Sequence, residues 1–133
     1  MKKISYNPHN HGTFKKEWGI HSKCREWWYA TGIMFDEEQN LYSYQYTLLS
    51  IYFGFITAQI AMVALTDFKN KHHYYLQCPA GKNWKLHVSE NEVSFGNIAS
   101  VTKQTDHMRI KLVHKNFSLD LKAQYGKGAF WHC

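Results

Sequence analysis

The uncharged stretch at residues 39–66 is the feature that most constrains what this chain can fold into. Its first half, LYSYQYTLLSIY at 41–52, alternates between two kinds of side chain. One set of alternate positions is aromatic and aliphatic, namely Tyr42, Tyr44, Tyr46 and Leu48. A period of two is typical of a β-strand, because successive side chains point to opposite faces. The stretch therefore predicts a strand with an aromatic face and a more polar face.

Short strands separated by turn residues are predicted along most of the chain. Gly54 allows a tight reversal into ITAQIAMVALTDF, a second strand that ends near Asp67. Further strands are predicted at 25–34, 73–78, 84–89, 92–98, 107–114 and 117–124. No stretch shows a convincing helical period with caps. Eight or so strands with short turns indicate an all-β fold, an antiparallel sheet curled into a barrel or half-barrel.

Charge is distributed unevenly along a chain whose net charge is +6. Residues 1–25 contain six Lys or Arg and residues 69–133 contain ten, whereas residues 26–68 contain none. Half of the aromatic side chains lie in that central segment, apart from the cations. A single-strand nucleic-acid binder needs both kinds of group on one surface. Nucleic-acid binding is therefore kept only as an alternative, and we expect no nucleic acid as a partner.

Several other classes of protein are disfavoured by composition. The cysteines at 24, 78 and 133 are odd in number and form no CxxC motif, which indicates reduced thiols and a cytoplasmic protein. No apolar signal segment follows the N-terminal lysines. Gln45 and Gln59 argue against a membrane span. The nine histidines lack partners at ligand spacing, so we expect no metal and no other cofactor.

The two ends of the chain suggest its domain organisation. We expect an N-terminal arm at 1–18 and one β-barrel domain at 19–133. The run AFWHC at 129–133 is strand-like and aromatic, and a domain seldom finishes on such residues. We therefore expect either that the native product continues beyond Cys133 or that this run is tucked into the sheet.

The stretch REWWYATG at 25–32 carries the first candidate site. Adjacent strand residues face opposite ways, so Trp27 and Trp28 require cover on both faces of one strand. Each is either ordinary core or the wall of an apolar pocket, which Tyr29 would extend. Glu26 beside two indoles needs a partner, which could be an indole N–H, Arg25 or His21. Glu26 is then either a general acid or part of a structural network, and the network is favoured.

Two further polar residues are candidate ligand contacts. Gln45 would orient a ligand if the polar face of its strand points inward, and would be an ordinary solvated residue if that face points outward. Asp67 either caps the turn that follows it or acts as an acid at the mouth of the barrel.

Three blocks in the chain together resemble a known family. EWWYATG preceded by His21, then YSYQYTLLS, then AQIAMVALTDF, resemble the hydroxyneurosporene synthase, or carotenoid 1,2-hydratase-like, family, and FSLDLKAQYGKGAFWH is similar to a later strand of it. The resemblance implies a lipocalin-like β-barrel, the first of two such domains. It also implies a lipophilic, isoprenoid-like ligand and a hydratase or isomerase reaction. The Trp-x-Asp-Arg-Glu-Trp block of the family's second domain is absent.

We therefore expect a lipophilic small-molecule site lined or braced by seven residues: His21, Glu26, Trp27, Trp28, Tyr29, Gln45 and Asp67. The catalytic residues are unknown, because any reaction would require the second domain. A second lipocalin-like domain or self-association is the expected macromolecular partner. The alternatives are a non-catalytic lipocalin-like carrier or oligomerisation module, and a basic single-strand nucleic-acid binder.

Overall fold

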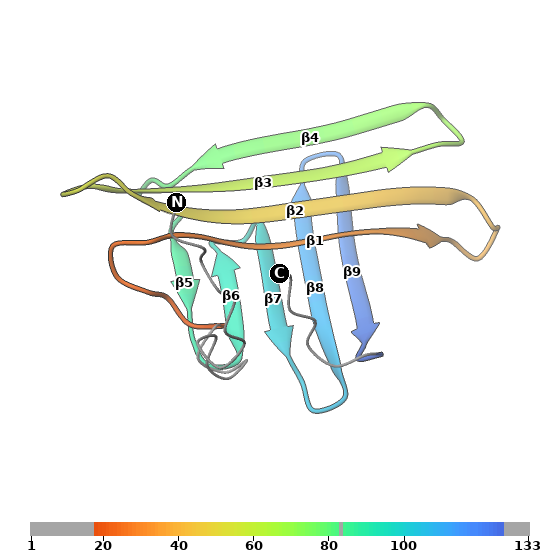
Figure 1. The fold of residues 1–133 in the computed structure, drawn as a ribbon. Helices are drawn as coiled ribbons and strands as arrows, with labels where there is room; N and C mark the ends of the chain where they lie inside the picture. Colours follow the sequence, from red (N-terminus) through yellow and green to blue (C-terminus); the bar gives the residue numbers. More distant parts are fainter. Residues whose placement is uncertain (1–17, 83, 127–133) are drawn as a thin grey trace, which may run out of the picture.

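The computed structural model describes residues 18–82 and 84–126, which form two antiparallel sheets (Figure 1). The four-stranded sheet has the order β1-β2-β3-β4 and the five-stranded sheet the order β5-β6-β7-β8-β9. The strands are β1 (Arg25–Phe35), β2 (Leu41–Tyr52), β3 (Thr57–Asp67), β4 (His72–Pro79), β5 (Leu86–Val88), β6 (Glu92–Phe95), β7 (Ala99–Lys103), β8 (His107–His114) and β9 (Phe117–Gln124). The all-β prediction is confirmed.

The four-stranded sheet is built from hairpins whose turns match their sequence. The β2–β3 turn contains Gly54 at φ +78°, a conformation that glycine adopts without strain. The turns at the other end of the sheet carry Gln39 and Lys71 at positive φ. Each of these turns is held by the aspartate that begins it. Asp36 accepts the backbone N–H of Asn40 at 2.8 Å, and Asp67 accepts that of Asn70 at 3.0 Å.

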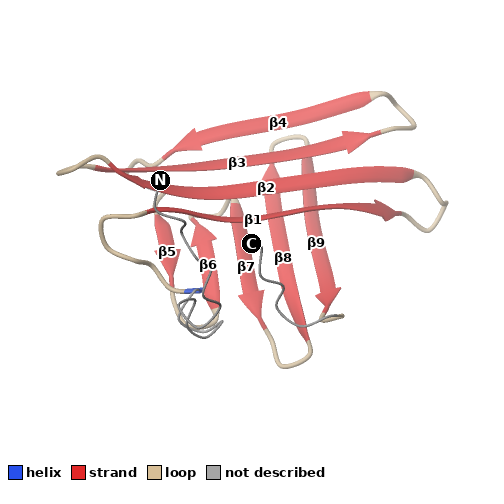
Figure 2. Cartoon of the chain, in the orientation of Figure 1, coloured by secondary structure: helices blue, strands red, loops and turns tan. Residues whose placement is uncertain are grey.

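The core lies between the two sheets, whose strands cross one another (Figures 1 and 2). Burial alternates along β1 to β4, so each of these strands has an inner face toward the other sheet and an outer face away from it. The inner face supplies Tyr46, Leu48, Ala61, Val63 and Cys78 to the core. The five-stranded sheet supplies Val93, Phe95, Ile98, Ala99, Val101, Ile110 and Leu112.

Of the two predicted forms, barrel and half-barrel, the structure has the open one. No strand of one sheet is paired with a strand of the other within the described residues. At one end the sheets meet through aromatic rings instead, where Tyr74 of β4 lies 5.7 Å from Phe117 of β9 and 6.4 Å from His114, measured between ring centroids. Side-chain packing rather than a continuous ladder therefore joins the two layers.

One predicted strand is shorter than expected, and the strand that follows it was not predicted. The sequence favoured a single strand at 92–98, but β6 ends at Phe95 and β7 begins at Ala99. Gly96 has a φ of +53°, which reverses the chain between them, and the N–H of Ile98 donates to the carbonyl of Phe95 at 3.1 Å. The count rises to nine strands in the described part of the chain.

The aspartate-capped turns predict acid sensitivity. Hydrogen bonds from Asn40 and Asn70 hold the pKa of Asp36 and of Asp67 below the ordinary value of 3.8. Because these pKa values are lowered in the folded state, the stabilisation is complete above about 3.8 and is lost as the pH falls through the folded pKa values. We expect the free energy of unfolding, measured by urea titration across acid pH, to fall less steeply in Asp36→Asn and Asp67→Asn. The exposed control Glu37→Gln should follow the wild type, and equal slopes in all four proteins would contradict this account.

Candidate functional site: a cleft between the two sheets

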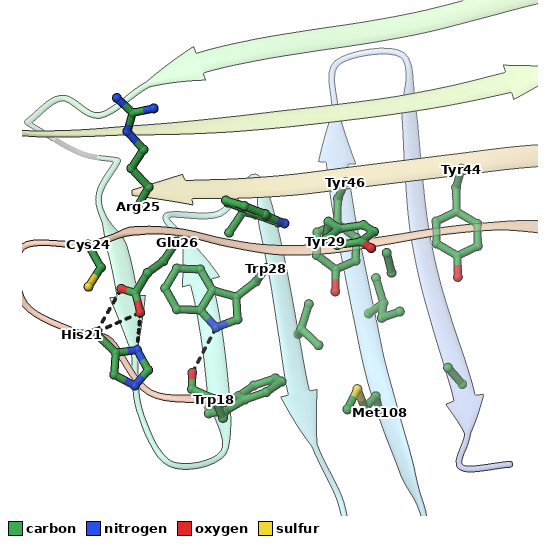
Figure 3. A pocket seen from close by; sticks show the side chains of 15 residues that line it. Trp18, His21, Cys24, Arg25, Glu26, Trp28, Tyr29, Tyr44, Tyr46 and Met108 are labelled. Atoms are coloured by element: carbon green, nitrogen blue, oxygen red, sulfur yellow. Dashed lines mark hydrogen bonds and ion pairs between the residues drawn. The ribbon is translucent and has the colours of Figure 1, made fainter. Parts of the chain in front are cut away.

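A cleft of about 700 Å3 opens between the inner face of β1 and β2 and the strands of the second sheet (Figure 3). The residues around it are Trp18, His21, Cys24, Arg25, Glu26, Trp27, Trp28, Tyr29, Ala30, Tyr44, Tyr46, Val101, Met108, Ile110 and Ala123. Small-molecule sites typically occupy roughly 300–1,000 Å3 and are mostly apolar with a few polar groups. This cleft has both properties.

Trp28 forms one wall of the cleft, as Figure 3 shows. It lies on the inner face of β1 and packs against the core. Its indole N–H donates to the carbonyl of Trp18 at 3.0 Å, and the indole N–H of Trp18 donates to the carbonyl of Ser89 at 3.1 Å. The ammonium of Lys103 lies 4.5 Å from the Trp18 ring centroid, a cation–π distance. These contacts fix the orientation of the Trp28 indole.

Tyr44 and Tyr46 of β2 extend their hydroxyl groups into the same cleft (Figure 3). Tyr46 is 4% exposed, and burial raises its pKa, so its phenol is neutral and able to donate a proton in a hydrogen bond. Within residues 18–82 and 84–126 neither hydroxyl has a hydrogen-bond partner. The described residues contain no buried side-chain oxygen without a partner, so these two hydroxyls lie at the accessible surface of the cleft, where a ligand can reach them.

Gly32 makes room for the Tyr44 ring. It is paired with Tyr44 across the β1–β2 ladder. A Cβ atom at Gly32 would lie 2.8 Å from Cε1 of Tyr44, closer than such contacts allow. The absence of a side chain at Gly32 therefore lets the ring lie over β1 on the inner face.

Glu26 and His21 form a hydrogen-bonded pair at the edge of the cleft. The two carboxylate oxygens of Glu26 both accept the backbone N–H of His21, each at 2.9 Å, and Nδ1 of His21 contacts Oε1. The side chain of Glu26 is only 13% exposed. Of the partners that the sequence left open for this carboxylate, the structure gives His21. These hydrogen bonds hold the loop that leads into β1. They agree with the structural alternative for Glu26, in which the carboxylate belongs to a hydrogen-bond network.

Trp27 and Tyr29 border the cleft, yet their side chains lie largely outside it. They are 58% and 61% exposed, and they alternate with the inward-facing Trp28 along β1. The prediction that the two tryptophans lie on opposite faces is therefore confirmed. The described residues supply cover for Trp28 but none comparable for Trp27.

Gln45 and Asp67 are not part of the cleft. Gln45 lies exposed on the outer face of β2, and Asp67 lies at the far end of β3, where its carboxylate accepts the N–H groups of Asn70. Asp67 thus caps its turn, the commoner of the two uses considered. A ligand role for either residue stays a prediction, and this geometry does not support it.

The sequence reasoning missed Tyr44 and Tyr46 as site residues. A signal for them existed, because they alternate with Leu48 on one face of the strand at 41–52. The ligand contact was sought instead on the opposite, more polar face, at Gln45. Trp18, Met108 and Ile110 reach the cleft only through the tertiary fold.

The described part of the chain adds two structural findings. Among these residues, no three His, Cys, Asp or Glu side chains are grouped so as to hold a metal ion. No helix in this part is long and apolar enough to cross a membrane.

The fold is that of an all-β half-barrel made of two antiparallel sheets, and a solved structure shares it. The crystal structure of "a putative AttH (NE1406)" from Nitrosomonas europaea at 2.00 Å resolution matches with a TM-score of 0.69 and 22% sequence identity. The match covers 86% of this chain and 38% of that chain, so this chain spans well under half of its neighbour's length. No family model and no curated protein matches the sequence.

Proposed function

We propose that the cleft binds a lipophilic small molecule that carries at least one hydrogen-bonding oxygen. The observation that carries the proposal is a pair of hydroxyls, of Tyr44 and Tyr46, that have no hydrogen-bond partner among residues 18–82 and 84–126 and that face a mostly apolar cleft of about 700 Å3. An apolar ligand body would displace water from Trp28, Val101 and Ile110, which favours binding through the hydrophobic effect. A ligand oxygen would satisfy the hydroxyls, which a pure hydrocarbon could not do.

The chemical class of the ligand is suggested by the sequence. The stretch at 26–32 and the strand at 41–52 resemble hydroxyneurosporene synthases, which implies an isoprenoid or polyene body. The same resemblance implies a hydratase or isomerase reaction only together with a second domain. We therefore propose binding for this chain, and catalysis stays a prediction for a protein that includes both domains.

All-trans-retinol, a polyene alcohol, is a suitable probe of the proposed site. We expect it to quench tryptophan emission, since Trp28 forms the wall of the cleft. Tyr46→Phe removes only the hydroxyl and should weaken retinol binding about 5- to 10-fold, the equivalent of one hydrogen bond. It should leave the affinity for the corresponding hydrocarbon, which has no hydroxyl, almost unchanged.

Tyr75→Phe is the matched control for that experiment. Tyr75 lies on the outer face of β4, and its hydroxyl donates to Gln77 at 2.9 Å. Its loss should leave retinol affinity within about 2-fold of the wild type, since surface changes are usually small. Absence of saturable retinol binding by the wild type would rule out a polyene-alcohol site. An equal effect of Tyr46→Phe on both probes would exclude the hydroxyl as the polar contact.

A further inference from the structure

The outer face of the four-stranded sheet carries large apolar side chains that lack cover from the described residues. Trp27, Tyr29, Ile33 and Phe35 of β1 are 58%, 61%, 70% and 59% exposed, and Tyr75 of β4 is 52% exposed. Their neighbours on β2 are mixed, since Tyr29 is opposite Thr47 and Ile33 is opposite Ser43, but the row of Trp27 is apolar across three strands. Trp27 is opposite Leu49, which is opposite Ile60. Exposed large apolar side chains gathered on one face in this way mark an interaction site rather than a solvated face.

The second sheet provides an internal comparison. Its outer face carries Arg109 and Lys111 on β8 and Asp120 and Lys122 on β9, all exposed. This is the ordinary pattern of a sheet with one face in water. The two outer faces of the molecule therefore differ in character, because that of β1–β4 combines large apolar side chains with neutral polar ones and carries a single Lys or Arg, Arg25, among its strand positions.

Charge indicates which kind of partner fits the apolar face. The chain has a net charge of +6, so two copies repel wherever their cations meet. The outer face of β1–β3 comes from the segment without Lys or Arg between 26 and 68, with Arg25 at its end, and β4 at 72–79 adds no Lys or Arg. No carboxylate lies on that face within the strand positions described. Two copies can thus join there without burying like charges.

The area of the face is also appropriate for a stable dimer. Strands of 11, 12, 11 and 8 residues form the sheet. At about 3.3 Å per residue and about 4.8 Å between strands, the face measures about 36 by 19 Å, or about 700 Å2. A standard stable interface buries about 800 Å2 on each partner. In a two-fold dimer both copies contribute the same patch. The patch therefore needs only to fit itself, which it does if the side-chain rows of one copy pack between those of the other.

We propose that this chain forms a two-fold symmetric homodimer through the outer faces of β1–β4, with Trp27, Tyr29 and Ile33 as the buried anchors. The second copy supplies the cover that Trp27 lacks. The inference does not depend on the proposed ligand site, which lies on the opposite face of the same sheet.

Sedimentation velocity of the 133-residue chain over a range of micromolar concentrations tests the dimer. We expect twice the monomer mass for the wild type and the monomer mass for Gln45→Lys. Gln45 is exposed at the middle of the face, between Thr31 and Ala64, so this substitution removes no core packing. Symmetry places two new ammonium groups in the interface, and we expect dimerisation to weaken at least about 100-fold. Ile33→Lys should act in the same way.

Gln124→Lys is the matched control, because Gln124 is an exposed glutamine on the outer face of β9. It adds the same charge elsewhere and should leave the dimer intact. Circular dichroism and urea titration should give a folded protein for all three variants. A wild type that is monomeric at every concentration overturns the proposal, including one that binds lipid vesicles through this face. The proposal is also overturned if Gln45→Lys remains a dimer. It is equally overturned if Gln124→Lys weakens dimerisation as much as Gln45→Lys does. Retinol binding, measured in parallel, reports separately on the cleft.

Discussion

Phe95→Ala is expected to lower the free energy of unfolding by about 3–5 kcal/mol, the typical cost of removing a fully buried aromatic ring. Phe95 is 0% exposed and has the largest volume among the fully buried side chains of the described residues. Its position at the end of β6 places it in the core cluster with Val93, Val101 and Leu112. The cost combines the lost transfer free energy of the ring with the cavity left between the sheets.

Urea unfolding monitored by tryptophan emission measures this effect. A domain of this size has a total stability of about 5–15 kcal/mol, so Phe95→Ala brings the protein close to unfolding. Phe55 is the matched control, because it is 88% exposed in the β2–β3 turn. Phe55→Ala should change stability by no more than about 0.5 kcal/mol. Similar losses for the two alanine variants would show that the described core is not the source of stability.

Alternation of side chains made most of the fold predictable. In the strand at 41–52 and in the pair Trp27–Trp28, alternation shows which residues share a face and which lie on opposite faces. Closure into a barrel could not be predicted in this way, because it depends on whether the edges of two sheets pair. Local sequence does not show whether two distant strands pair. In the structure the two sheets stay unpaired within the described residues, which gives an open half-barrel.

The site was harder to predict because both faces of the first sheet carry apolar side chains. Where one face is wholly polar, alternation identifies the inner face. The outer side of β2 is mixed, because it carries three polar residues, Ser43, Gln45 and Thr47, and three apolar ones, Leu41, Leu49 and Ile51. The choice between inward and outward Gln45 was left open for this reason. The packing of Tyr46 and Leu48 against the second sheet decides it.

Glu26 illustrates a different limit. A carboxylate next to two indoles must have a partner, and the sequence offered three. Only the path of the loop before β1 brings the backbone N–H of His21 to both carboxylate oxygens. Such a contact depends on loop geometry, for which the pattern of residues carries little information.

The cleft itself can be tested by filling it. Ala30 lies on the inner face of β1, opposite Tyr46, and lines the cleft. Ala30→Phe places a ring where a ligand would bind, and because the space is empty the added volume should cause little strain. We expect retinol affinity to fall at least about 10-fold through this steric block, a change of about 1.4 kcal/mol or more.

The most direct measurement is a titration of retinol emission with the wild type, Ala30→Phe and Ala64→Phe, each shown by urea unfolding to be folded. Ala64 is the equivalent alanine on the outer face, two strands away on β3. The inter-sheet site requires that Ala30→Phe loses retinol binding while Ala64→Phe binds as the wild type does. Retention of full affinity by Ala30→Phe, or its loss in Ala64→Phe instead, would contradict a ligand site between the sheets.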